Sequence, residues 1–229
     1  LLNILLPGIF SFIFGLLITP LVTHYLYKHK VWKKAGGKQA IGGHEATEFN
    51  RIKGGDEHKT PRMGGIVVWA SIIATLGLAY VLGIVFPNSF FAGLDFLSRS
   101  QTLIPVTMLV AGAGLGFLND FYDVTRAGQG LRLKHRLLVI SALAGILGWW
   151  FYTKLDVSGI SIPGDGVLEV GWLIIPFFIF LTLIIYASGV IDGIDGLSGG
   201  VFASIFAAYT GIALLNGQYD LAAFCATTV

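Results

Sequence analysis

Long apolar runs alternate with shorter polar stretches along this chain, and these runs predict its architecture. A helix needs about 20 mostly apolar residues to cross the hydrocarbon core of a bilayer. The pattern therefore predicts an all-α polytopic membrane protein with six complete spanning helices and the start of a seventh near Tyr219. The six are expected at Leu1–Tyr27, Gly64–Phe86, Leu103–Phe121, Leu137–Tyr152, Trp172–Val190 and Leu197–Leu215.

The stretch between the fourth and fifth predicted helices has a different pattern. Residues 157–170 read VSGISIPGDGVLEV, with β-branched residues on both sides of a Pro-Gly-Asp-Gly sequence. Such runs around a glycine- and proline-rich turn are typical of β-hairpins. We therefore expect a short hairpin outside the membrane, with its turn at Gly164–Gly166.

Composition agrees with a membrane protein, because 55% of the 229 residues are hydrophobic and only 12% are charged. Soluble domains carry about 25% charged residues. The single cysteine, Cys225, excludes an internal disulfide. The chain begins at Leu1 without a methionine and ends at Val229 inside an apolar run, so we expect a fragment incomplete at both ends.

The basic residues predict the orientation, since cytoplasmic loops of membrane proteins are enriched in lysine and arginine. Arg99 and Lys154 alone lie in the two loops expected outside. The other thirteen lie in two loops that we expect on the cytoplasmic side: Lys28, Lys30, Lys33, Lys34, Lys38, Arg51, Lys53, Lys59 and Arg62 in the first, and Arg126, Arg132, Lys134 and Arg136 in the second.

Acidic and amide side chains lie at the expected cytoplasmic end of the third helix, in GFLNDFYDV (residues 116–124). Asp120 and Asp123 are three residues apart and share one face of a helix. Two carboxylates on one face suit Mg²⁺, which is commonly held by one or two carboxylates together with substrate phosphates. The alternative is a helix end whose acids lie among lipid head groups, although acids there oppose the helix dipole.

A second acidic stretch, IDGIDGLSGG (residues 191–200), follows the fifth predicted helix. Burying a charge at the centre of a membrane helix costs about 2.5–3.5 kcal/mol on insertion scales, so Asp192 and Asp195 at a helix mouth suggest a functional site. Gly193 and its neighbouring glycines would let a ligand approach the backbone. The alternative is an acidic turn between two membrane helices.

A basic stretch, HKTPRMGG (residues 58–65), precedes the second predicted helix. Lys59, Thr60 and Arg62 stand before a glycine-rich helix N-terminus, which is a natural anion site. The alternative is a basic belt that binds lipid head groups. With the orientation above, all three stretches converge on the cytoplasmic face, which favours a phosphate-bearing substrate held there by a metal ion.

These stretches, with GLRLKHRLL at residues 130–138, resemble in order and spacing the polyprenyl-phosphate N-acetylhexosamine-1-phosphate transferases. The resemblance covers about residues 59–201. It implies a fold of about ten helices, a single transferase domain over residues 1–229 and Mg²⁺ as cofactor. It also implies transfer of a phospho-sugar from a UDP-linked amino sugar to undecaprenyl phosphate, with release of UMP. The implied location is the bacterial inner membrane, with the active site on the cytoplasmic face.

The resemblance also implies roles for individual residues. The family's paired catalytic acids fall on Asn119 and Asp120, with Asp120 as the metal ligand, and Asp123 is a further catalytic candidate. The acids that contact the nucleotide fall on Asp192 and Asp195. This sequence departs from the family at Asn119, which cannot act as a carboxylate base and binds metal more weakly, and at Gly189, which replaces an asparagine.

The sequence leaves the donor sugar open. The hairpin followed by VGWLIIPFFIF is most similar to the branch that transfers phospho-N-acetylmuramoyl-pentapeptide and makes lipid I. Asp123 and the PRMGG form of the first motif are instead more typical of the N-acetylglucosamine-1-phosphate branch. The family's later Asp-Gly metal motif and histidine loop lie beyond this sequence, so the fragment itself is expected to be inactive.

Two other classes remain as alternatives. Asn119, Asp120 and Asp123 also resemble the start of an intramembrane aromatic prenyltransferase motif, although its next acid corresponds to Ala127. The acids could also form the ion path of a coupled transporter, whose acids usually lie nearer the midplane of the membrane. The expected partners are the two substrates and the lipid bilayer, with a homodimer as a further expectation and no nucleic acid.

Overall fold

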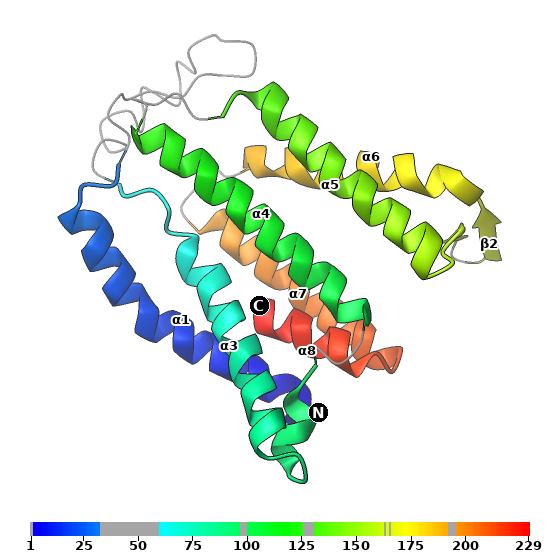
Figure 1. The fold of residues 1–229 in the computed structure, drawn as a ribbon, viewed down its shortest axis with the longest axis horizontal. Helices are drawn as coiled ribbons and strands as arrows, with labels where there is room; N and C mark the ends of the chain where they lie inside the picture. Colours follow the sequence, from blue (N-terminus) through cyan, green and yellow to red (C-terminus); the bar gives the residue numbers. More distant parts are fainter. Residues whose placement is uncertain are drawn as a thin grey trace. The chain divides into compact units, whose positions relative to one another are not determined.

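The computed structural model describes residues 2–32, 60–96, 100–125, 131–162, 164, 166–191 and 196–229. Helices dominate it, with one small two-stranded sheet in the described part (Figure 1). Its elements are, in order, α1 (Leu2–Lys28), α3 (Ile66–Val85), the 3-10 helix η1 (Phe90–Leu94), α4 (Ser100–Thr125), α5 (Leu133–Lys154), β1 (Gly159–Ile162), β2 (Gly166–Glu169), η2 (Gly171–Leu173), α6 (Ile174–Ala187), η3 (Ser188–Ile191), α7 (Leu197–Leu215) and α8 (Tyr219–Thr228).

Five helices in the described part of the chain are long and apolar enough to cross a membrane: α1, α3, α4, α5 and α7. They leave most of their apolar side chains exposed, since at most 28% of the most apolar window in any of them is buried inside the protein. Lipid is the solvent that such surfaces need. The mostly helical fold predicted from the apolar runs is confirmed, with five helices of spanning length in the described part where six were predicted.

The fifth predicted span, Trp172–Val190, differs from a continuous helix. Its α-helical part, α6, has only 14 residues, and 3-10 turns extend it on both sides. Gly171 takes a positive φ of 56° at the start, a conformation that glycine adopts without strain. Apolar composition shows which residues can lie in lipid, but it does not distinguish α-helical from 3-10 hydrogen bonding, so the length of this α-helix was overestimated.

Two other helices extend beyond the apolar runs that predicted them. Helix α4 continues past Phe121 to Thr125, and α5 begins at Leu133 rather than Leu137. Hydropathy locates only the part of a helix inside the hydrocarbon, whereas backbone hydrogen bonding continues into the polar boundary. As a result Asp123 lies in the last turn of α4, on the same helix as Asp120.

The contacts of the chain divide it into two compact units, residues 1–131 with 202–229 and residues 132–201. In the first unit, α1 packs against both α3 and α8. Its core includes Ile72 and Leu76 of α3, Leu94 of η1 and Phe224 of α8. The crossing of α1 and α8 is close, because a Cβ added to Gly8 would stand 2.8 Å from the carbonyl oxygen of Ala226.

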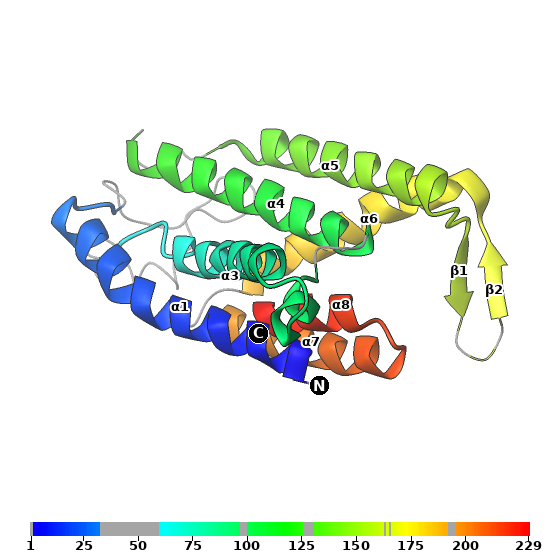
Figure 2. The ribbon, with the colours of Figure 1, turned by 60° about the horizontal axis from the view of Figure 1, so that its bottom comes forward.

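In the second unit, α5 packs against α6, and the hairpin β1–β2 joins them (Figure 2). A Cβ at Gly148 would lie 3.0 Å from Cα of Ile175, so glycine permits this close packing. The strands are antiparallel, with Gly159 opposite Glu169 and Ile162 opposite Gly166. The predicted hairpin is confirmed, although residue 165 of its expected turn, Gly164–Gly166, lies outside the described part.

The single transferase domain expected over residues 1–229 stays a prediction. The candidate site residues that the structure describes all lie in the first unit.

Candidate active site

The segment before α3 is fixed to the end of α1 by its backbone. The amide of Arg62 donates a hydrogen bond to the carbonyl oxygen of Val31, at 2.7 Å. The next residue, Met63, has a φ of 69°, in the left-handed region that non-glycine residues rarely adopt. Gly64 and Gly65 follow and lead into α3. The PRMGG sequence thus forms a sharp turn, and a backbone hydrogen bond fixes its beginning to Val31.

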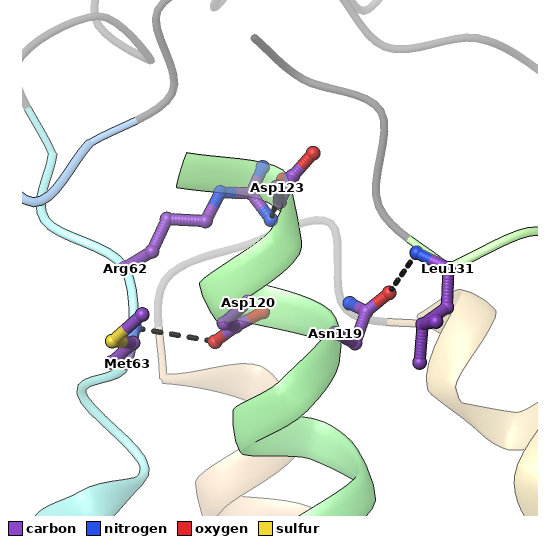
Figure 3. A network of polar contacts seen from close by, with 6 residues as sticks. All are labelled: Arg62, Met63, Asn119, Asp120, Asp123 and Leu131. Atoms are coloured by element: carbon purple, nitrogen blue, oxygen red, sulfur yellow. Dashed lines mark hydrogen bonds and ion pairs between the residues drawn. The ribbon is translucent and has the colours of Figure 1, made fainter. Parts of the chain in front are cut away.

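The last turns of α4 contact this segment at two points (Figure 3). The backbone amide of Met63 donates to Oδ2 of Asp120 at 3.2 Å, and Nη1 of Arg62 lies 3.2 Å from Oδ2 of Asp123. Asp120 and Asp123 are one helical turn apart, so consecutive residues of the segment meet consecutive turns of one helix face. The structure therefore brings two of the three predicted motifs into direct contact.

Asn119 makes a different contact, on the other side of α4 from the Met63 segment in Figure 3. Its Oδ1 accepts a hydrogen bond from the backbone amide of Leu131, at 3.2 Å. The side chain thus links the end of α4 to the backbone at Leu131. Asn119 and Asp120 are neighbours in sequence, but in this structure they bind different segments of backbone.

Burial explains why Asp123 has a cationic partner. Its side chain is only 10% exposed, whereas that of Arg62 is 34% exposed. A buried carboxylate is strongly unfavourable unless a charge or hydrogen-bond donors compensate it. Arg62 supplies that charge, and its guanidinium has five N–H donors, more than one carboxylate oxygen can accept from.

The carboxylates also fit the implied metal ion in their chemistry. Mg²⁺ prefers oxygen ligands and is usually bound by one or two carboxylates, water and substrate phosphates. Asp120 supplies such oxygens beside the cationic Arg62. Among the residues that the structure describes, no group of three or more histidines, cysteines, aspartates or glutamates could hold a metal ion alone.

Several candidate residues cannot be placed in this site. Lys59, Asp192, Gly193 and Asp195 lie outside the described residues. Thr60 is described and exposed, at the start of the PRMGG segment. The predicted roles of all these residues, and those of Asn119, Asp120 and Asp123, stay predictions.

Sequence reasoning missed the partners that organise the site. Val31, Met63 and Leu131 act through backbone groups, and their side chains gave no chemical signal. A methionine directly before two glycines gives no indication of a positive φ, since asparagine and glycine are the usual residues there. Only the i, i+3 spacing of Asp120 and Asp123 indicated that both would face the same neighbour.

Comparison with known proteins identifies the family. Residues 102–229, more than half of the chain, match the family described as glycosyl transferase family 4. The chain belongs to this family. This confirms the resemblance to phospho-sugar transferases that the motifs predicted. It favours a glycosyl transferase over the aromatic prenyltransferase and the coupled transporter.

Three relatives of the chain carry the same name. Phospho-N-acetylmuramoyl-pentapeptide-transferase of Rubrobacter xylanophilus is 30% identical over 195 residues, which are 81% of this chain and 53% of the relative. The enzyme of the same name from Geobacillus kaustophilus is 31% identical over 227 residues, 96% of this chain and 61% of the relative. The one from Bacillus licheniformis is 28% identical over 231 aligned residues, which are 99% of this chain and 64% of the relative. The chain thus spans between about half and two thirds of the length of these relatives.

Proposed function

We propose that this chain is the substrate-binding part of an Mg²⁺-dependent enzyme that transfers a phospho-sugar to a polyprenyl phosphate. The donor is a UDP-linked amino sugar and the acceptor is undecaprenyl phosphate, at the cytoplasmic face of a bacterial membrane. Membership in glycosyl transferase family 4 supports the reaction class. The names of the relatives support phospho-N-acetylmuramoyl-pentapeptide as the transferred group. The product of that transfer, by the family resemblance, is lipid I.

The reaction exchanges one phosphorus–oxygen bond for another. An oxygen of the lipid phosphate attacks the sugar-linked phosphorus of the donor, and the bond to the uridine-linked phosphate breaks, releasing UMP. A phosphate monoester has a second pKa near 6, so most of the acceptor is already deprotonated at pH 7. The site therefore needs charge neutralisation and alignment more than it needs a general base.

The residues at the end of α4 suit these needs. Arg62 can donate to phosphate oxygens, because its side chain remains 34% exposed beside Asp123. Asp120 is placed to hold Mg²⁺, which when bound neutralises negative charge on the phosphates. Asn119 holds the backbone at Leu131 and offers an amide in place of the family's first acid. The proposed roles of Asp192 and Asp195, contact with the nucleotide, rest on the resemblance alone.

The observation that carries the proposal is the pairing of the first two motifs. A cation from the segment before α3 lies 3.2 Å from a carboxylate of α4, and a second carboxylate is held one turn away. A helix end that only met lipid head groups would need no such cross-link. The arrangement places a phosphate-binding cation next to a metal-binding carboxylate, which is what transfer between two phosphates requires.

A second donor is supported by the two segments of this same pairing. Asp123 and the PRMGG form of the first motif, which contains Arg62, are the features that resemble the N-acetylglucosamine-1-phosphate branch. The corresponding donor is UDP-N-acetylglucosamine. The two proposals share the acceptor, the metal and the release of UMP, and they differ only in the sugar.

A donor comparison tests both proposals. The full reading frame is purified and UMP release is measured with undecaprenyl phosphate and either UDP-N-acetylmuramoyl-pentapeptide or UDP-N-acetylglucosamine. We expect release only when donor, acceptor and Mg²⁺ are all present, with loss of release after chelation by EDTA. Faster turnover of one donor identifies the sugar. No UMP from either donor, by a protein that is folded, would contradict the proposed function.

A further inference from the structure

Asp123 has two candidate uses, and the structure distinguishes them. As a second carboxylate on the face of Asp120 it could hold the metal ion, or as the partner of Arg62 it could hold that cation in place. Its side chain is 10% exposed and one of its oxygens lies 3.2 Å from the Arg62 guanidinium. A guanidinium this close competes with Mg²⁺ for the charge of the carboxylate and repels the metal ion, so the contact favours the second use.

Arg62 is held through both its backbone and its side chain. Its backbone amide is bound to Val31 of the segment after α1, and its guanidinium is bound to Asp123 of α4. Met63 adds a third attachment, because its amide donates to Asp120 while its backbone remains in the left-handed region. A positive φ at a non-glycine residue persists when surrounding contacts determine it. The three contacts together hold the arginine at one place relative to Asp120.

From these contacts we infer that Asp123 is a positioning residue, which orients Arg62 toward the phosphates of the donor and does not bind the metal ion. This inference rests on the proposed function and extends it to a division of labour on α4. Asp120 binds the metal ion, and Asp123 orients the Arg62 guanidinium. A long, flexible arginine side chain that is already ordered loses less entropy when it binds a phosphate.

The first test measures the pair without substrate or metal. Arg62→Gln, Asp123→Asn and the double variant are compared by thermal unfolding of the full reading frame in detergent, with the exposed Asp156→Asn as control. Each single change removes one charge and leaves the other unpaired, so the double variant should lose no more Tm than the more damaging single variant. Additive losses would overturn the pairing, and so would an unchanged Tm in both single variants.

The second test separates positioning from metal binding. Asp123→Asn should raise the KM for the UDP-sugar about tenfold, as expected for losing an ordered charge-assisted contact. Arg62→Gln should do the same, and the Mg²⁺ concentration for half-maximal rate should stay unchanged in both. Asp120→Asn should raise that Mg²⁺ concentration. If Asp123→Asn raises it as much as Asp120→Asn does, Asp123 is a metal ligand and the inference is wrong.

Two further outcomes keep the tests independent. Asp123→Glu, which keeps the charge, should restore part of the donor KM, and it replaces Asp123→Asn if that variant does not fold. A wild-type protein that releases no UMP would contradict the proposed function. The unfolding comparison would then still decide separately whether Arg62 and Asp123 act as a pair.

Discussion

At the scale of single residues, the site depends on which oxygen binds which donor. Asp120, Asp123 and Asn119 lie within two turns of α4, and each contacts a different group. Asp120 accepts from the Met63 amide, Asp123 forms an ion pair with the Arg62 guanidinium, and Asn119 accepts from the Leu131 amide. Three similar side chains therefore have three different environments. Their roles follow from these partners more than from their residue types.

Asn119→Asp provides a prediction at this scale. An aspartate can keep the hydrogen bond from the Leu131 amide, because a carboxylate oxygen also accepts. It would add a second carboxylate beside Asp120, which should strengthen Mg²⁺ binding. We expect several-fold faster UMP release at low Mg²⁺ and little change at saturating Mg²⁺, measured in the full reading frame.

The contrary outcomes are also informative. Equal rates for Asn119→Asp and wild type at every Mg²⁺ concentration would mean that position 119 does not reach the metal ion. Slower UMP release by Asn119→Asp at saturating Mg²⁺ would mean that the added charge disturbs the hydrogen bond from the Leu131 amide.

At the scale of helices, the close crossing of α1 and α8 supports the unit that holds the site. Glycine at position 8 lets the helices approach until a Cβ there would stand 2.8 Å from a backbone oxygen. Small residues at such crossings let helices in membranes pack by van der Waals contact, where no hydrophobic effect drives them together.

Gly8→Leu should therefore destabilise this unit. Overpacking costs about 1–3 kcal/mol and should appear as a lower Tm in detergent. Gly77→Ala is the matched control, because nothing lies within 4 Å of a Cβ at position 77 of α3. That change should leave the Tm equal or higher, since alanine favours helix by about 1 kcal/mol over glycine. Equal Tm values for Gly8→Leu and wild type would contradict the crossing.

The same scale shows what the sequence could predict. The apolar runs located every membrane helix of the described part, because lipid exposure requires apolar side chains along the whole span. They misplaced the ends of α4, α5 and α6, because helix ends depend on local hydrogen bonds. The contact between Arg62 and Asp123 was also beyond prediction, since it depends on how α3 and α4 pack.

At the scale of the whole molecule, orientation in the membrane links the motifs to their substrates. A nucleotide-linked sugar is a cytoplasmic metabolite, so the proposed function needs the end of α4 on that side. The concentration of lysine and arginine in residues 28–62 and 122–136 favours that orientation.

Cysteine labelling of intact cells tests the orientation. Cys225, the one native cysteine, is buried and can be replaced by alanine. Single cysteines are then introduced at His44, Gly128 and Ser161. A membrane-impermeant maleimide should label position 161 in intact cells, and positions 44 and 128 only after the cells are opened. Labelling of position 44 or 128 in intact cells would contradict the predicted orientation in the membrane.

The most direct test of the central claim is the effect of Asp120→Asn on UMP release. The account places the reacting phosphates beside this carboxylate, and the isosteric change removes its charge while its remaining oxygen can still accept from Met63. In the full reading frame we expect loss of nearly all UMP release at physiological Mg²⁺, with the Tm preserved, whereas Asp156→Asn should turn over at the wild-type rate. Wild-type release by Asp120→Asn would show that the end of α4 is not the site of transfer.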